Sequence, residues 1–281
     1  MRHGVVLFTS DRGITPAQAA KAAEENGFES FYVPEHTHIP VKRTAAHPST
    51  GGAELPDDRY MRTLDPWVSL AMAAAVTSTI RLGTAVALPV EHDPISLAKT
   101  LATLDHLSGG RVTLGVGFGW NTDELDDHHV PAGKRRTVLR EYLEAMTSLW
   151  SQEEGGYDGE FVQFGPSWAW PKPIQQPRLP VIVGAAGGPK TFAWIARSAD
   201  GWMTTPTEAG IDEKVANLKA AWAAEGREGA PQIVVLAGKP DLELFAHWQS
   251  LGVTELVFGM PDKSPDEVVA YLGRLRAKLS P

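Results

Sequence analysis

The segment from Arg81 to Trp120 constrains the fold of this chain more than any other part of the sequence. It starts with an apolar, β-rich run and continues with Asp93-Pro94, a typical helix start. A Gly-Gly pair then precedes a second apolar run. Neither apolar run alternates with polar residues, which is typical of parallel strands that helices cover on both faces. The segment therefore predicts a strand, a helix and a second strand parallel to the first.

The same unit recurs along the whole chain. Apolar runs predict strands at residues 5–8, 31–33, 81–88, 112–116, 181–183, 201–203, 233–236 and 256–258. A helix is predicted after each strand, and several starts are explicit, as at Thr15-Pro16, Asp65-Pro66 and Ser264-Pro265. Eight alternations favour an α/β fold, a closed (β/α)8 barrel formed by residues 1–281 as one domain. An open doubly wound sheet is the alternative.

Two segments interrupt this rhythm and are interpreted as insertions. The polar segment 38–61 follows the second strand, and the segment 152–180 follows the fourth strand and its helix. Within the latter, residues 157–164 predict a hairpin and residues 171–180 an extended, proline-rich connection. We expect both insertions, with Trp168 and Trp170, to form a lid over an apolar or aromatic substrate.

Composition limits the class of partner. The net charge of -8 argues against general binding to nucleic acid or to an anionic membrane, since both require a positive field. The chain has no cysteine, which excludes disulfides, thiolate metal sites and a cysteine nucleophile. The apolar run at the N-terminus is too short for a signal peptide, and no stretch reaches membrane-spanning length, so we expect a cytoplasmic protein.

In such a barrel the active site lies at the carboxyl ends of the strands. Glu35 and His36 follow the second strand there, and a carboxylate with an imidazole can act as an acid and base pair. His36 and His38 also have the spacing of a metal site, but the strand ends at residues 183, 203 and 258 supply no further ligand, so no metal is predicted. His128-His129 is interpreted as a surface pair.

Small residues follow the third and fourth strands. Thr84, Ala85 and Val86 leave room for a planar ring against the backbone, although ordinary core filling gives the same pattern. The segment from Gly117 through Gly119 to Trp120 allows close backbone approach, and Trp120 can wall a pocket. These glycines do not have the spacing of the dinucleotide-binding fingerprint, which excludes that type of site.

The fifth strand leads into a glycine-rich helix start. The residues Gly184, Gly187, Gly188, Pro189 and Lys190 combine free backbone N-H groups, the positive end of a helix dipole and one cation. This combination predicts an anion site, typically for phosphate. The spacing is not that of a nucleoside triphosphate loop.

Together, several collinear motifs carry a family resemblance. They are RLGTAV (81–86), LATLDHLSGGRVTLGVGFGW (101–120), PKPIQQP (171–177), VIVGAAGGPKT (181–191) and ARSADGW (196–202). The chain resembles the luciferase-like monooxygenase superfamily, and more narrowly its branch that uses the deazaflavin coenzyme F420. That resemblance implies a (β/α)8 barrel with the cofactor at its mouth, commonly in a homodimer, and the alanine-rich helix from Asp65 is a candidate dimer face.

The resemblance also implies roles for particular residues. Ala85-Val86 matches the position of a non-prolyl cis peptide that forms a bulge behind the cofactor ring. Glu35 and His36 match the acidic residue and the histidine that approach the ring, His36 as proton donor or acceptor and Glu35 as the group that orients it. Gly187, Gly188 and Lys190 match the phosphate loop.

One departure bears on the substrate. In the sugar-phosphate dehydrogenases of this branch a glutamate proton donor follows the last glycine of the fourth strand, and here Trp120 stands in its place. The leading hypothesis is a coenzyme F420-dependent oxidoreductase that moves a hydride between the deazaflavin and a small organic substrate. The alternatives are an FMN-dependent monooxygenase served by a separate reductase, a flavin- or deazaflavin-binding protein without catalysis, and a metal-dependent hydrolase.

Overall fold

Eight parallel strands close into a barrel in the part of the chain that the computed structural model describes, residues 1–237 and 240–279. Around the barrel the strands follow the order β1-β10-β9-β8-β7-β4-β3-β2, so that neighbours in the sequence are neighbours in space. Their bounds are β1 (Arg2–Leu7), β2 (Ser30–Val33), β3 (Arg81–Thr84), β4 (Val112–Val116), β7 (Val181–Gly184), β8 (Gly201–Thr204), β9 (Gln232–Ala237) and β10 (Glu255–Met260). The predicted (β/α)8 barrel is confirmed.

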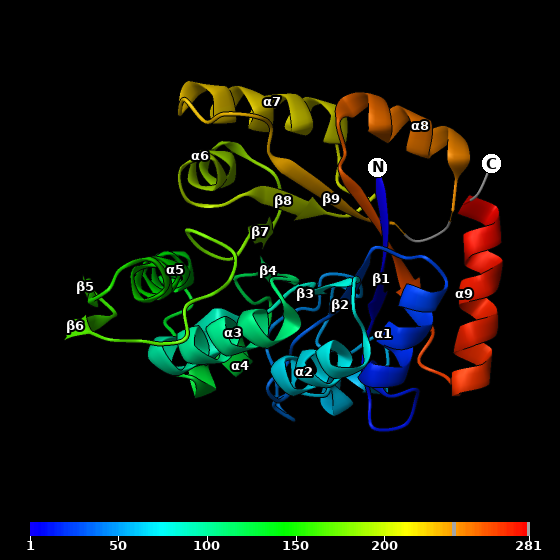
Figure 1. Cartoon of the computed structure of the whole chain (residues 1–281), viewed down its shortest axis with the longest axis horizontal. Helices are drawn as coiled ribbons and strands as arrows, with labels where there is room; N and C mark the ends of the chain where they lie inside the picture. Colours follow the sequence, from blue (N-terminus) through cyan, green and yellow to red (C-terminus); the bar gives the residue numbers. More distant parts are fainter. Residues whose placement is uncertain (238–239, 280–281) are drawn as a thin grey trace.

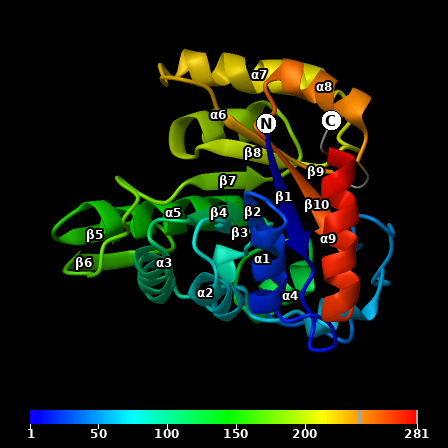
Figure 2. The same ribbon diagram turned by 45° about the vertical axis from the view of Figure 1, so that its right-hand side comes forward.

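Helices surround the barrel as a ring (Figure 1). They are α1 (Pro16–Glu25), α2 (Pro66–Val76), α3 (Pro94–Ser108), α5 (Arg135–Ser151), α6 (Pro189–Ser198), α7 (Ile211–Ala224), α8 (Leu242–Leu251) and α9 (Pro265–Leu279). The predicted starts are confirmed: Thr15, Asp65 and Asp93 each accept a hydrogen bond from a backbone N-H in the first turn. None of the helices described is long and apolar enough to cross a membrane. Figure 2 shows α9 beside α1, where β10 pairs with β1 and closes the ring.

The core has two layers. One layer fills the inside of the barrel and contains Tyr32, Ile182, Met203, Val234 and Val257, all almost completely buried. The other lies between the strands and the surrounding helices. Ala85, Val86, Leu236 and Val6 pack on the inner layer, so the barrel is a filled core and ligands can enter only at its ends.

The third strand is shorter than the sequence predicts. It ends at Thr84, the peptide bond between Ala85 and Val86 is cis, and a turn of 3-10 helix, η2 (Pro89–Glu91), follows. The expected non-prolyl cis peptide is therefore present in this structure. Apolar residues continue beyond Thr84 because they pack over the barrel mouth, and for this reason hydrophobicity alone did not mark the end of the strand.

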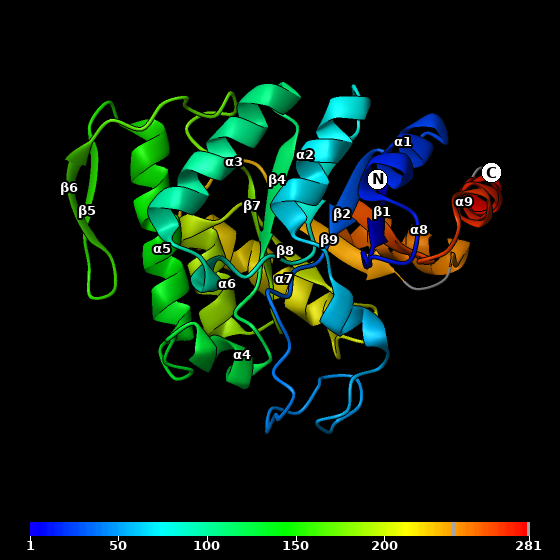
Figure 3. The same cartoon turned by 90° about the horizontal axis from the view of Figure 1, so that it is seen from below.

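Each of the two insertions contains an element of its own. Segment 38–61 leads into η1 (Asp58–Arg62), which was not predicted, and the expected hairpin is formed by β5 (Gly155–Asp158) and β6 (Gln163–Ser167). A further short helix, α4 (Thr122–Asp127), follows β4 and was also missed. Figure 3 shows the segment that leads into η1 on the same side of the barrel as α4.

The second insertion does not cover the mouth. The hairpin lies outside α5 in Figure 3, and the Gln175 side chain donates to the carbonyl of Val112, the first residue of β4. The Trp170 carbonyl accepts a hydrogen bond from Lys99 on α3, and the Trp168 side chain is exposed. Residues 152–180 therefore run along the outside and the amino end of the barrel, and the prediction that they form a lid is wrong.

Candidate active site at the barrel mouth

A cavity of about 300 Å³ lies at the carboxyl ends of the strands. Its lining comes from the ends of β3, β7, β8 and β9, and consists of Ala85, Val86, Gly184, Ala185, Ala186, Met203, Thr204, Thr205, Glu208 and Leu236. Val33 on β2 pairs with Thr84 on β3, so the chain from Pro34 to His36 leaves the barrel next to Ala85 and Val86. The volume and the mostly apolar walls are typical of a small-molecule site.

Two of the predicted glycines have a specific packing role here. A Cβ atom on Gly184 would lie 2.5 Å from Val86 Cγ1, and one on Gly117 would lie 2.6 Å from Val86 Cγ2. The Val86 side chain thus fits between these two backbone positions. We conclude that Gly117 and Gly184 make room for Val86, which in turn forms part of the cavity wall.

Other predicted wall residues lie at or beside the mouth. The Thr84 hydroxyl is buried and donates to the Gly115 carbonyl at 2.7 Å, so Thr84 ties β3 to β4 outside the cavity lining. Gly119 has a φ of +73°, a left-handed conformation that favours glycine, and turns the chain into Trp120. The Trp120 ring lies edge-on to His36, with 5.7 Å between the ring centroids.

The partner of His36 is a residue that the sequence did not indicate. His36 Nδ1 lies 2.8 Å from Glu124 Oε2, and only 7% of the His36 side chain is exposed. Glu35 points elsewhere, since its carboxylate accepts hydrogen bonds from the Leu88 N-H at 2.6 Å and from His92 Nε2 at 2.7 Å. The prediction that Glu35 orients His36 is therefore wrong, because Glu124 on α4 does so.

A third buried carboxylate adjoins this pair. Glu91 Oε2 accepts a hydrogen bond from the Thr37 hydroxyl at 3.1 Å, and Thr37 Oγ1 lies 2.7 Å from His128 Nε2. Among the described residues, Glu91 Oε1 is buried without a hydrogen-bonding partner. His128, interpreted from the sequence as part of a surface pair, is partly buried: its side chain is 27% exposed and faces Thr37 and Glu91.

The environment of these groups shifts several pKa values. Burial, together with the neighbouring carboxylates of Glu124 and Glu35, raises the pKa of Glu91 to about 9. Burial alone would lower the pKa of His92, but the hydrogen bond and charge of Glu35 outweigh it and the net pKa is raised. Burial and the nearby His38 lower the pKa of His128. At neutral pH we therefore expect Glu91 to be protonated and His128 to be neutral.

The first insertion closes one side of the mouth with aromatic rings. His47 and Tyr60 lie edge-on to each other at 5.0 Å between centroids, and the His47 ring is 4.7 Å from that of Trp120. The ring centroids of Tyr60 and His36 are 5.5 Å apart. Asp123 on α4 holds this insertion by accepting the N-H groups of residues 44 and 45. Residues 38–61 therefore lie at the mouth, and their predicted role as a lid over the substrate stays a prediction.

In the glycine-rich loop, one backbone N-H group binds a carboxylate of the chain itself. The Gly187 N-H donates to Glu208 Oε1 at 3.1 Å, and Glu208 also pairs with Lys214 on α7. Gly188 is the residue before α6, Pro189 is its first residue, and Lys190 is exposed in its first turn. The structure thus brings the predicted anion-binding residues to the rim of the cavity, where a carboxylate of the chain itself meets one of them.

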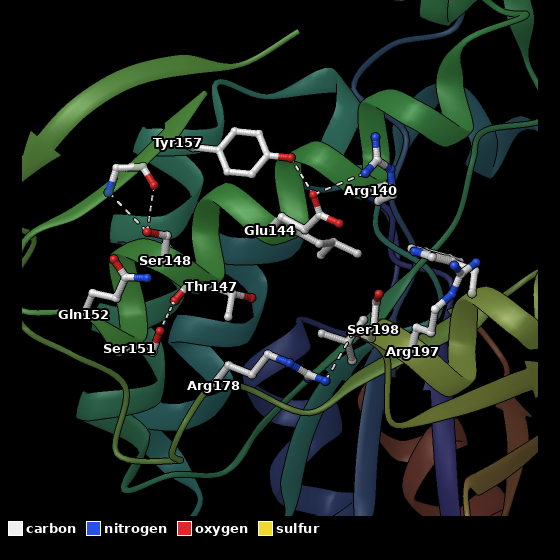
Figure 4. Close-up of a pocket in the computed structure, with 14 residues that line it drawn as sticks. Arg140, Glu144, Thr147, Ser148, Ser151, Gln152, Tyr157, Arg178, Arg197 and Ser198 are labelled. Carbon is white, nitrogen blue, oxygen red and sulfur yellow. Dashed lines mark hydrogen bonds and ion pairs between the residues drawn. The ribbon is translucent and has the colours of Figure 1, made fainter. Parts of the chain in front are cut away.

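A second hollow, of about 420 Å³, lies on the side of the barrel between α5, the hairpin and α6. Figure 4 shows Arg140 beside Glu144 and Arg178 beside Ser198, and Arg178 also pairs with Asp200. This hollow is remote from the carboxyl ends of the strands, and its charges are compensated. We do not assign the active site to it.

Sequence reasoning missed five residues of the mouth: His47, Tyr60, Glu91, His92 and Glu124. Glu91 and His92 fell between the strand that was predicted to end at residue 88 and the helix start at Asp93. Glu124 lies in a polar run that gave no apolar periodicity. The signal that was available is the Gly-Trp turn at the end of β4, because a turn there points the following residues back over the mouth.

The described residues include no group of three or more histidine, cysteine, aspartate or glutamate side chains arranged to hold a metal ion. The histidines at the mouth are instead paired with carboxylates, His36 with Glu124, His92 with Glu35 and His38 with Asp127. Their arrangement is that of hydrogen-bonded acid and base groups.

The sequence was compared with known proteins. The sequence profile of a family described as luciferase-like monooxygenase matches residues 15–240. An uncharacterized protein of Mycobacterium tuberculosis is 71% identical over 280 residues, which cover 100% of this chain and 99% of that protein. The F420-dependent hydroxymycolic acid dehydrogenase of the same species is 31% identical over 250 residues, which cover 86% of this chain and 62% of that enzyme.

Two solved structures share the fold. A monooxygenase from Streptomyces bottropensis superposes with a TM-score of 0.80 at 22% identity, covering 99% of this chain and 98% of that one. An F420-dependent secondary alcohol dehydrogenase in complex with an F420-acetone adduct gives a TM-score of 0.75 at 16% identity, with the same coverage. At these identities the likeness shows the fold alone.

Proposed function

The chain belongs to the luciferase-like monooxygenase family, and we propose that within it the protein is a coenzyme F420-dependent oxidoreductase. The observation that carries the proposal is the joint arrangement at the mouth. An apolar cavity backed by Ala85 and Val86 shares the mouth with a histidine-carboxylate pair, His36 with Glu124, and with the glycine loop that begins at Gly184. A flat ring with a phosphate tail requires these three features together.

The residues present fit such a cofactor. Ala85, Val86, Met203 and Leu236 give the cavity an apolar floor and walls against which a ring can stack. The Gly187 N-H already binds a carboxylate oxygen of the chain, so the loop can donate to an oxygen anion. We propose that Gly187, Gly188 and Lys190 would hold the phosphate, and that Glu208 would give up its bond to Gly187 as the phosphate binds.

The bound deazaflavin supplies the hydride acceptor or donor at its ring, and the chain supplies position and protons. His36 would take up or release the proton of a substrate hydroxyl, while Glu124 fixes the tautomer and orientation of its imidazole. Trp120, Tyr60 and His47 pack beside His36 and one another at the mouth. These rings favour a small apolar or aromatic alcohol or ketone over a sugar phosphate, which would need cationic groups in their place.

A fluorescence titration tests this proposal. Purified protein should bind the deazaflavin with a Kd of about 1 µM or lower and FMN far more weakly. Ala186→Trp fills the cavity rim from an exposed position and should abolish binding. Ala230→Trp, exposed before β9 at the opposite end of the barrel, is the matched control and should bind as the wild type does. Equal or tighter binding of FMN would refute the choice of cofactor and favour the monooxygenase alternative.

We also propose that the protein is a homodimer that pairs through α2 and α3. Both helices present large apolar side chains to solvent: Val68 is 62% exposed, Met72 is 52% exposed and Leu107 is 76% exposed. Helix α2 contains no charged residue, which is unusual for a helix face in water. Sedimentation equilibrium should give a dimer for the wild type and a monomer for Met72→Glu, and a monomeric wild type would refute the pairing.

A further inference from the structure

The proposed function gives Glu124 a role beside His36 but leaves the buried carboxyl group next to it, that of Glu91, unexplained. Both side chains have an exposed fraction of 0%. Glu124 accepts three hydrogen bonds, from His36 Nδ1, the Thr37 N-H and Asn121 Nδ2, and these satisfy an ionised carboxylate. Glu91 accepts only the Thr37 hydroxyl. The protein therefore supplies more hydrogen-bond donors to Glu124 than to Glu91.

The neighbouring charges also disfavour the ionised form of Glu91. The charged or titratable groups that act on Glu91 are Glu124 from α4, Glu35 from the end of β2 and His128 at 3.9 Å. Two of these are carboxylates, and neighbouring buried carboxylates cannot both ionise without a large cost. Glu91 Oε1 has no donor among the described residues, as is expected if this oxygen itself carries the proton and directs it at a neighbouring acceptor.

We infer that Glu91 and Glu124 share one proton at neutral pH, and that this pair connects His36 to solvent through Thr37 and His128. The inference rests on the proposed function for its purpose, since a histidine that exchanges protons with a substrate must itself be re-equilibrated. Glu91 is not among the residues that line the cavity, so it is a positioning and proton-relay residue that acts through Glu124 and His36.

Hydrogen bonds on either side of the interaction between Glu124 and Glu91 form a continuous route. From inside to outside it runs from His36 to Glu124, then to Glu91, to the Thr37 hydroxyl and to His128. The inner end is buried, while Thr37 is exposed and the His128 side chain is 27% exposed. The low pKa of His128 leaves its imidazole neutral and able to accept a proton from Thr37.

The protons balance along this route. When His36 takes up a proton on Nε2, its Nδ1 proton passes to Glu124. The Thr37 hydroxyl, which donates to Glu91 Oε2 at rest, turns its proton to His128, and the Glu91 carboxyl group turns so that its own proton passes to the Thr37 oxygen. One proton enters at His36 and one leaves at His128. The reverse sequence delivers one proton to His36, and no buried charge accumulates in either direction.

Infrared spectroscopy of the cofactor-free protein tests the shared proton. The wild type should show the C=O band of a protonated carboxyl at pH 7, and this band should disappear as the pH is raised above 9. Glu91→Gln, which keeps the size and a neutral side chain, should lack the band. Glu141→Gln removes another buried carboxylate, on α5 away from the mouth, and should retain it. A wild type without the band at pH 7, or a Glu91→Gln protein that keeps it, would overturn the inference.

Solvent exchange of the His36 Nδ1 proton, followed by nuclear magnetic resonance in the same cofactor-free protein, tests the route. Exchange should slow about tenfold or more in Glu91→Gln and in Thr37→Val, since a relay step is removed in each. Thr37→Ser keeps the hydroxyl and should restore the wild-type rate, a rescue that a purely structural role would not give. Unchanged exchange in Glu91→Gln would refute the relay.

Both readouts are independent of the cofactor. A protein that failed to bind the deazaflavin but showed the protonated carboxyl and the slowed exchange would refute the proposed function and leave the relay standing. A protein that bound the deazaflavin but showed neither the protonated carboxyl nor the slowed exchange would support the proposed function and refute the relay.

Discussion

The fit of Val86 between two glycines gives the sharpest quantitative prediction. A Cβ atom on Gly184 would lie 2.5 Å from Val86 Cγ1, whereas carbon atoms in contact are about 3.5–4.0 Å apart, so Gly184→Ala must displace Val86 by about 1 Å. Overpacking of this kind costs about 1–3 kcal/mol. Because Val86 lines the cavity, its displacement should also weaken deazaflavin binding about tenfold, which corresponds to about 1.4 kcal/mol.

Urea denaturation, followed by far-UV circular dichroism, measures the cost in stability. The double variant Val86→Ala, Gly184→Ala should lose less stability than the sum of the two single losses, by about 1 kcal/mol or more. The reason is that Val86→Ala removes the methyl groups that the Cβ atom of Gly184→Ala would meet. Gly188→Ala is the matched control: no atom lies within 4 Å of the added Cβ, and we expect no loss of stability.

Two single effects that simply add would contradict this prediction. Additivity within about 0.5 kcal/mol would mean that Val86 and Gly184 do not press on each other, and that the glycine serves some purpose other than making room for the bulge. A loss of stability in Gly188→Ala equal to that in Gly184→Ala would show a general sensitivity of the loop instead.

Three further predictions concern stability. Glu91→Gln removes the buried acid whose pKa is raised to about 9. The stability that this raised pKa contributes is fully present below the unfolded pKa near 4.5 and is lost as the pH rises toward 9. Urea denaturation should therefore show that the free energy of unfolding of the variant, relative to that of the wild type, increases by about 1 kcal/mol per pH unit between pH 6 and 8. Burial alone would raise the pKa of Glu24, but hydrogen bonds from the N-H groups of residues 78–80 lower it to about 2. After solvent screening, thermal unfolding should show the wild type more stable than Glu24→Gln by about 1 kcal/mol at pH 7. This difference in stability should disappear as the pH falls from 4.5 to 2. Asp123→Ala should free residues 38–61 and speed their limited proteolysis while global stability falls by less than about 2 kcal/mol.

The barrel was predictable because each of its units carries its own local signals. Apolar runs mark the strands, and Thr15, Asp65 and Asp93 cap helices that start where the sequence predicts. These signals depend on neighbouring residues only, and a fold made of repeated neighbouring units is determined largely by such contacts.

The chemistry of the mouth was only partly predictable because its pairs join distant residues. His36 and Glu124 are 88 positions apart, and Glu35 and His92 are 57 apart. From sequence alone, Glu35 was assigned as the partner of His36 because the two are adjacent. In the structure, consecutive residues leaving β2 point to different neighbours, so Glu35 turns toward η2 while His36 meets α4.

The second insertion shows the same limit. Its tryptophans and prolines were consistent with a lid, but the Gln175 side chain ties it to Asp105 on α3 and to Val112 at the amino end of β4. A hydrogen bond of that kind, between a loop amide and residues some 70 positions away, leaves no periodic trace in the sequence.

Competitive equilibrium dialysis decides which of the two cofactors the protein binds. Wild-type protein is dialysed against equal concentrations of the deazaflavin and FMN, and both are quantified in the protein chamber by their absorption spectra. We expect close to one equivalent of deazaflavin per chain to be retained, with FMN near its free concentration. Retention of FMN in equal or greater amount, or of neither compound, would contradict this expectation.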